Sequence, residues 1–296
     1  MIMRLLFGVL TVLSLLAGIG AIFQGGVLDL NFFRCMWTKN YECPHEDIKF
    51  FLYTPTFRKG RIIDMNEPKS IFKVGFKTNQ QTAIIIHGFN GTQTSRHIMF
   101  LKDAYLSRKF NVFAVDWEVL SQYPCYFSSL SNTKLVSQCT AQKICYKYHI
   151  FFAGLDPARP LIEKHASKKF RLTRDDARSV QIIHTNAGLL GQSSFSGRVD
   201  FCINGGQVQP YCEGDRIKQA RCSHFLSVCY LANAILASRP MRAFRCPSGC
   251  VPDNRIPFVK SNRVRMKWLT VGQDTPGNVT GGYCVHMEQN MNCPFN

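Results

Sequence analysis

The feature that most constrains the fold is a short apolar run that ends at Leu155 and is followed at once by an aspartate. Pro157 and Pro160 then prevent the chain from continuing as a strand or a helix. The run predicts a buried parallel strand over residues 148–155 that presents Asp156 at its carboxyl end. Because ligands bind at the carboxyl edge of open α/β sheets, Asp156 is a candidate acid of a functional site.

Two further segments have the same buried character. Residues 82–87 and 111–117 show no alternation with polar residues, which is typical of strands covered on both faces. Apolar spacing over residues 95–110 predicts a helix between them. This order favours one α/β domain with a mostly parallel sheet and helices on both faces. Further elements are expected at residues 47–53 (strand), 131–147 (helix), 175–179 (short helix), 180–185 (strand) and 223–237 (helix).

The first 23 residues have the composition of a secretory leader. One early charge, Arg4, precedes a long apolar stretch, which predicts a signal peptide over residues 1–23, with an uncleaved anchor as the alternative. Thirteen cysteines fit a secreted, extracellular chain with disulfides, and because the number is odd, at least one has no internal partner. The sequons at Asn90 and Asn278 are candidate glycosylation sites.

The charge balance bears on possible partners. The chain has 36 Lys and Arg residues against 19 Asp and Glu, a net charge of +17. Either these residues form an ordinary solvated surface or they favour peripheral contact with anionic membranes or matrix. Nucleic acid is not an expected partner, because no long Lys/Arg run and no nucleic-acid motif occurs. A composition of 46% hydrophobic and 19% charged residues excludes a disordered chain.

Two other segments could act with Asp156. The His87-Gly-Phe89 turn follows a buried strand, so its backbone N–H groups can stabilise an oxyanion. His224 follows Cys222 closely, at the start of a predicted helix. An acid followed by a histidine is the chain order of α/β-hydrolase triads. The sequence therefore indicates an acid–histidine pair.

The remaining candidates are assigned structural roles. Asp116 ends a strand and is expected to cap a loop. His87, His97 and His184 are interpreted as structural histidines. Cys246 and Cys250 could form half of a metal site, but in a secreted chain a disulfide role is favoured.

Together these segments resemble the pancreatic-lipase family, and most closely its short-lid, phospholipase A1-like members in insects. The resemblance covers most of residues 40–240 and implies an α/β-hydrolase fold. In it, Asp156 matches the triad acid, His224 the triad histidine and Phe89 the residue whose backbone N–H forms part of the oxyanion hole. It rests on His87-Gly-Phe, Val115-Asp-Trp, Gly154-Leu-Asp-Pro-Ala, Ile183-His-Thr-Asn-Ala, Val199-Asp-Phe, Asn204-Gly-Gly-Gln-Val-Gln-Pro and Cys222-Ser-His.

The resemblance has implications for disulfides and domains. A Cys212–Cys222 pair would hold a very short lid, which goes with phospholipid rather than triglyceride as substrate. Cys125–Cys139 is the other preferred pair, and Cys145 is the candidate unpaired thiol. Residues 30–296 are expected to form a single lipase-like domain without the C-terminal β-sandwich of the vertebrate enzymes.

The calcium-binding segment of pancreatic lipases has changed here. Lys168 and Thr173 occupy positions expected to be acidic, although Arg171 and Asp176 remain. Calcium requires several oxygen ligands. We therefore expect neither a metal nor any other cofactor.

The nucleophile is the main departure from the family pattern. No Gly-x-Ser-x-Gly occurs in the chain. The nearest imitation, Gly191-Gln-Ser-Ser-Phe-Ser-Gly197, lies after Asp156, in the wrong order. Ser193, Ser194 and Ser196 are therefore not assigned as the nucleophile.

Residue spacing predicts that a whole segment is missing. A strand–helix–strand unit needs roughly 30 residues, so the stretch from Trp117 to Asp156 has room for one crossover where the family has two. The omission falls within residues 143–153 and removes a central strand, its serine and the following helix. Without the serine, no covalent acyl-enzyme can form.

These observations predict a secreted lipase or phospholipase A1-like ester hydrolase locus whose present product is inactive. The alternative is a non-catalytic secreted protein that uses the lipase scaffold to bind lipid or another protein. A third possibility is a chain that does not fold stably. The expected partner in the first case is a lipid or phospholipid interface.

Overall fold

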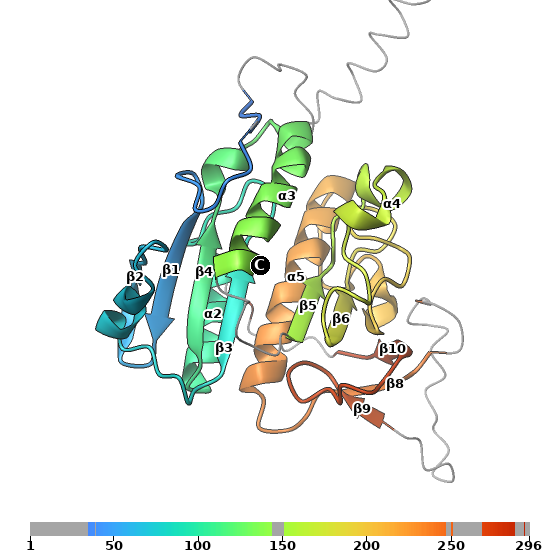
Figure 1. Ribbon diagram of the computed structural model, residues 1–296. Helices are drawn as coiled ribbons and strands as arrows, with labels where there is room; N and C mark the ends of the chain where they lie inside the picture. Colours follow the sequence, from blue (N-terminus) through green and yellow to red (C-terminus); the bar gives the residue numbers. More distant parts are fainter. Residues whose placement is uncertain are drawn as a thin grey trace, which may run out of the picture.

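The computed structural model describes residues 35–38, 40–143, 151–246, 250, 268–287 and 293. The predicted signal peptide and Cys145 lie outside these residues. The described part is an α/β fold with two sheets, the larger of which is mostly parallel, in agreement with the predicted fold class (Figure 1).

The first sheet has the strand order β2-β1-β4-β3. β1 pairs in antiparallel orientation with both β2 and β4, and β3 pairs in parallel with β4. The strands are β1 (Lys49–Thr54), β2 (Phe57–Ile62), β3 (Thr82–Ile86) and β4 (Asn111–Asp116).

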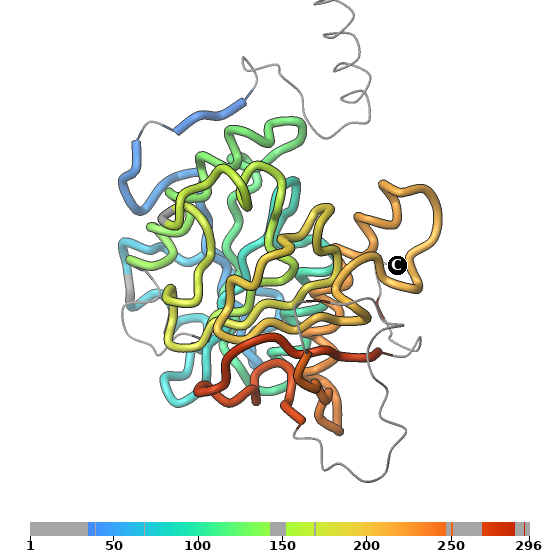
Figure 2. Tube along the Cα trace, turned by 90° about the vertical axis from the view of Figure 1, so that its right-hand side faces the viewer, coloured from blue at the N-terminus to red at the C-terminus, as the bar shows by residue number. Residues whose placement is uncertain are grey.

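The second sheet has the order β5-β6-β7-β10-β8-β9. Its first four strands are parallel, and β8 and β9 extend it in antiparallel orientation. Figure 2 shows the C-terminal strands, in red, along the lower edge of the molecule. The strands are β5 (Phe151–Leu155), β6 (Ser179–His184), β7 (Val199–Ile203), β8 (Arg242–Arg245), β9 (Trp268–Thr270) and β10 (Gly281–Val285).

Helices cover the strands on both faces. Figure 1 shows α3 in front of the strands and α2 and α5 behind them. Apolar residues of α2 and α5 pack in one core with β3, β4, β6 and β7, while α3 packs in a second core with β1 and β4. The helices are α2 (Arg96–Ser107), α3 (Tyr126–Lys143), α4 (Ile162–His165) and α5 (Arg216–Leu236).

Several predicted boundaries are wrong. α3 begins at Tyr126, five residues before the predicted start, and the expected short helix at 175–179 is replaced by a turn that leads into β6. β7 to β10 were not predicted, because three to five residues are too short to show a period.

Among the described strands, β3 and β5 are each paired on one side only. β3 ends the first sheet and β5 begins the second, although residues of both strands pack against the same apolar core. Ile86 and Phe152 on these strands are 39% and 37% exposed, whereas Val112 and Ile182 on the inner strands are fully buried. Only residues 144–150 separate α3 from β5. One apolar core therefore spans both sheets, while the described strands β3 and β5 are not hydrogen-bonded to each other.

Six disulfides join described residues, and one preferred pair is wrong. Cys125 pairs with Cys35, and Cys139 pairs with Cys43. Cys125 directly precedes α3 and Cys139 lies within it, so a helical rise of about 1.5 Å per residue separates them by about 20 Å. A disulfide spans no more than about 7 Å between Cα atoms. The other pairs are Cys202–Cys250, Cys212–Cys222, Cys229–Cys293 and Cys246–Cys284.

Removing the Cys43–Cys139 disulfide should destabilise the protein. Its half-cystines are 96 residues apart, but the retained Cys35–Cys125 disulfide shortens the loop to about 22 residues, 8 from Cys35 to Cys43 and 14 from Cys125 to Cys139. We expect the Cys43→Ser/Cys139→Ser variant to lose about 3 to 4 kcal/mol of unfolding free energy in chemical denaturation. The matched control, Cys212→Ser/Cys222→Ser, opens a separation of only 10 residues and should lose about 3 kcal/mol. Non-reducing peptide mapping that recovers a Cys125–Cys139 link would contradict this connectivity.

Candidate active site

Asp156 is a fully buried carboxylate at the end of β5. Its backbone has a φ of 48°, in the left-handed region. The Oδ1 atom accepts hydrogen bonds from the backbone N–H groups of Thr185 and Asn186, each at 2.9 Å. A side chain at Gly191 would overlap the carboxyl group, so only a glycine fits there. The loop after β6 thus holds the carboxylate in one orientation.

His224 completes an acid–histidine pair. It lies in the third turn of α5, a helix whose N-terminus is capped by the Asp215 side chain. Its Nδ1 atom is 2.6 Å from Oδ2 of Asp156, and its side chain is 28% exposed. An ionised carboxylate only accepts, so Nδ1 is the protonated nitrogen and Nε2 is left as the basic atom. Within the described residues Nε2 has no hydrogen-bond partner.

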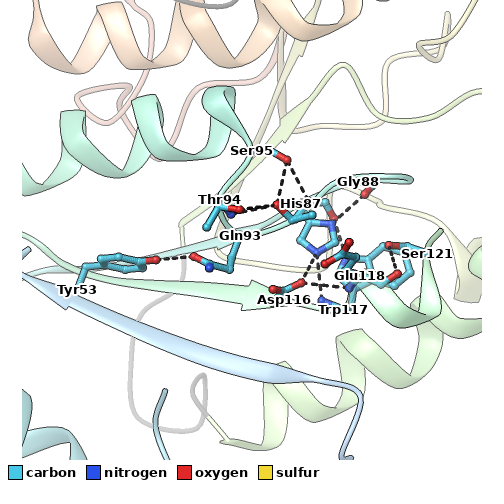
Figure 3. Close-up of polar contacts among 11 residues, drawn as sticks. Tyr53, His87, Gly88, Gln93, Thr94, Ser95, Asp116, Trp117, Glu118 and Ser121 are labelled. Carbon is cyan, nitrogen blue, oxygen red and sulfur yellow. Dashed lines mark hydrogen bonds and ion pairs between the residues drawn. The ribbon is translucent and has the colours of Figure 1, made fainter. Parts of the chain in front are cut away.

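The His87-Gly-Phe89 turn follows β3 and is held in a rigid conformation by contacts of His87 (Figure 3). The Trp117 backbone N–H donates to Nε2 of His87 at 3.1 Å, and the indole N–H of Trp117 donates to the His87 carbonyl at 2.8 Å. The two rings are stacked, with centroids 5.7 Å apart. His87 is therefore a structural residue that fixes the turn.

Phe89 retains a backbone N–H that is not used inside this turn. The N–H of Asn90 donates to the Ser121 carbonyl, and that of Gly91 donates to the Gly88 carbonyl. In the described part of the chain the Phe89 N–H has no such acceptor, and its ring meets Tyr126 edge-on at 5.1 Å. An oxyanion role for this N–H remains a prediction.

Two other acids have structural roles. Asp116 accepts a hydrogen bond from the Glu118 N–H at 3.1 Å, as a loop cap does. Burial alone would raise the pKa of Asp116, but the adjacent His87 side chain and the hydrogen bond from the Glu118 N–H hold it below its usual value. His184 is fully buried and lies 2.9 Å from Asp200, so this second acid–histidine pair has no access to a substrate.

His97 lies beside the candidate site, although the sequence alone predicts only a structural role for it. It lies in the first turn of α2, and its ring is 4.7 Å from that of Phe225, the residue next to His224. Burial, followed by the nearby His87 and His224, lowers the pKa of His97 to about 4. No sequence signal could have found this, because α2 and α5 meet only in the fold.

The segment expected to form a lid is very short. Cys212 and Cys222 are bonded to each other, and α5 already begins at Arg216. Only Glu213, Gly214 and Asp215 therefore form a free loop inside the ring. Ile217, in the first turn of α5, is 54% exposed and offers an apolar side chain at the lid.

The backbone N–H groups of the serines that follow Asp156 are hydrogen-bonded to acids other than Asp156. The backbone N–H groups of Ser193 and Ser194 each donate to Oε1 of Glu163 at 2.8 Å. The Ser196 hydroxyl is buried and has no partner in the described structure. Among the residues whose contacts are described, none of these serines is hydrogen-bonded to His224.

The expected calcium segment forms local contacts. Oδ2 of Asp176 accepts from the Thr173 N–H at 2.6 Å, and Nη1 of Arg171 donates to the Glu163 carbonyl at 3.3 Å. In the described ranges, no three His, Cys, Asp or Glu residues are grouped as metal ligands. In the same ranges, no helix combines the length and apolar character needed to cross a bilayer.

Comparison with known proteins gives a consistent result. A family model described as "Lipase" matches residues 31–146 and 151–251. "Phospholipase A1 member A" of Bos taurus is 30% identical over 236 residues, which cover 67% of this chain and 51% of the relative. "Phospholipase A1 2" of Vespa affinis is 27% identical over 295 residues, which cover 83% of this chain and 85% of the relative. The chain thus spans about half the length of the mammalian relative.

The position of Asp156 can be tested through Gly191. A Cβ added there would overlap the buried carboxylate, so Gly191→Ala should cost about 1 to 3 kcal/mol of unfolding free energy. Gly277→Ala is the control, because its added Cβ meets nothing within 4 Å. Equal stability of the two variants in urea denaturation would contradict the close packing around Asp156.

Stability should depend on pH through His97. Its pKa is about 4 in the folded protein and 6.5 in the reference state, so between these values the unfolded chain binds more protons. Stability therefore falls as the pH decreases from about 6.5 to about 4, and His97→Gln should flatten that slope in denaturation curves. The control His165→Gln, at an exposed histidine, should leave the slope unchanged. An unaltered slope in His97→Gln would contradict this account.

Proposed function

Because the chain belongs to the lipase family, we propose that it is a secreted, phospholipase A1-like protein that meets lipid but does not hydrolyse it through an acyl-enzyme. The relatives named as phospholipases A1 support phospholipid as the ligand class. Six disulfides and the apolar leader support an oxidising, extracellular location. Asn90 and Asn278 are both exposed, as proposed glycosylation sites must be.

One observation carries the proposed lack of hydrolysis. Among the described residues, no hydroxyl is hydrogen-bonded to Nε2 of His224, although Asp156 holds the imidazole in the tautomer that a general base needs. In serine hydrolases this nitrogen takes the proton of the nucleophile. Here the serine motif is absent from the sequence, and the family match itself is interrupted at residues 147–150.

The interrupted ladder supports the same conclusion. In this fold the nucleophile stands on a strand-to-helix turn at the carboxyl edge of the sheet. The separate edges of β3 and β5, with Ile86 and Phe152 partly exposed, agree with a missing strand between them. In this proposal the chain keeps the acid, the histidine and the backbone N–H of Phe89 but lacks the nucleophilic serine with which they would act.

The same edges favour one alternative function. An open strand edge can pair with an extended segment of another chain. A non-catalytic protein-binding role is therefore the second candidate, with β3 and β5 as the binding edges. Crosslinking from cysteines introduced at Ile86 and Phe152 to a co-purifying chain would support it, and recovery of an uncrosslinked monomer would count against it.

A paired assay tests the proposed lack of hydrolysis. Wild type and His224→Ala are incubated with a fluorogenic phospholipid and, separately, with a fluorophosphonate probe that labels activated serines. We expect wild-type hydrolysis no greater than that of His224→Ala, and no labelled serine. Hydrolysis that His224→Ala abolishes, together with a labelled serine, would contradict the proposal.

A further inference from the structure

Phe170 is the most exposed large hydrophobic residue of the described chain, at 58%. It ends the short helix η5 (Lys168–Phe170), in the segment that follows β5. The Lys134 ammonium of α3 lies 5.8 Å from the Phe170 ring centroid and 5.2 Å from that of Tyr41. Three segments far apart in the sequence therefore meet in one patch, which we call the Phe170 surface: Tyr41, Lys134, Lys168 and Phe170.

The charge at the Phe170 surface is not neutralised. Residues 159–178 contain seven Lys or Arg against three Asp or Glu. Glu163, one of these acids, is already held by Arg159 at 3.0 Å and by two backbone N–H groups. Lys134 and Lys168 are exposed and form no salt bridge among the described residues. Lys134 contacts the two rings, but no described carboxylate neutralises either lysine, so both can meet an external anion.

The patch is also held in place before any ligand arrives. The Cys35–Cys125 and Cys43–Cys139 disulfides fix the segment that carries Tyr41 against α3. On the other side, Arg171 donates to the Glu163 carbonyl of α4. Phe170 is therefore exposed on a constrained segment, and binding would require little ordering of the loop.

We propose that the Phe170 surface docks the protein on an anionic phospholipid bilayer. Phe170 and Tyr41 enter the headgroup region, where aromatic rings are favoured, while Lys134 and Lys168 meet lipid phosphates and carboxylates. A soluble polyanion would use the cations but gain nothing from the aromatic ring. The exposed ring beside cations that form no salt bridge with described residues is what selects the bilayer as the occupant. This inference rests on the lipid-interface role proposed above.

Vesicle co-sedimentation tests the docking surface. Wild type should bind vesicles of 70% phosphatidylcholine and 30% phosphatidylserine more tightly than pure phosphatidylcholine, and 0.5 M salt should weaken that binding. We expect Phe170→Ala to weaken it about tenfold, and the Lys134→Gln/Lys168→Gln variant to weaken it by more than tenfold, at about fivefold for each lysine.

Matched controls come from η2 (Pro68–Val74), which carries another exposed phenylalanine beside a lysine. Phe72 is 54% exposed, so Phe72→Ala and Lys73→Gln repeat the chemical changes at a different place. Both should bind anionic vesicles as wild type does. Thermal melts of all variants verify that these surface substitutions leave the fold intact.

Three outcomes would overturn the inference. If Phe170→Ala binds anionic vesicles as wild type does, the surface is wrong while the lipid role stands. If only the lysine variant loses binding, and loses heparin retention equally, the patch is a polyanion site. If wild type binds neither vesicle, the lipid-interface role itself fails. Serine-dependent hydrolysis in the separate activity assay would instead refute the proposed lack of catalysis and leave this surface unaffected.

Discussion

The hydrogen bonds of the buried Asp156 carboxylate are the interaction on which the site depends. A buried charge is costly unless it is paired and hydrogen-bonded. Here two backbone N–H groups of the loop after β6 and Nδ1 of His224 satisfy it. The carboxylate thus joins the end of β5, the β6 loop and α5 at one point. His224 keeps its orientation for this reason, and among the described residues no serine hydroxyl is hydrogen-bonded to it.

The second constraint is that one continuous apolar core spans two sheets whose described edge strands, β3 and β5, do not pair with each other. α5 packs against α2, and both contribute to the core that contains residues of β3, β6 and β7. Helix packing therefore holds the two sheets together where no pairing between described strands does. The exposed edge residues Ile86 and Phe152 are the cost of that arrangement. The Asp156–His224 pair can form because its hydrogen bonds depend on α5 and the loop after β6 rather than on pairing between β3 and β5.

The sequence predicted those site residues that can be recognised from their neighbours in the chain. Asp156 was identifiable from an apolar run ended by proline, and His224 from its position after Cys222. The disulfide partners of Cys125 and Cys139 could not be derived, because the true start of α3 decides which pairs are within reach. His97 and the Phe170 surface were missed because each depends on contacts between segments far apart in the chain. Spacing counts did predict that only one crossover fits before Asp156.

Hydrogen exchange, followed by mass spectrometry, tests the central claim that the strand ladder is interrupted between β3 and β5. In a parallel edge strand, about half of the N–H groups point away from the one paired neighbour and lack a partner. Peptides covering β3 and β5 should therefore exchange faster than those covering the inner strands β4 and β6. Equal protection across all four strands would contradict the account, because it would mean that another segment pairs with both edges.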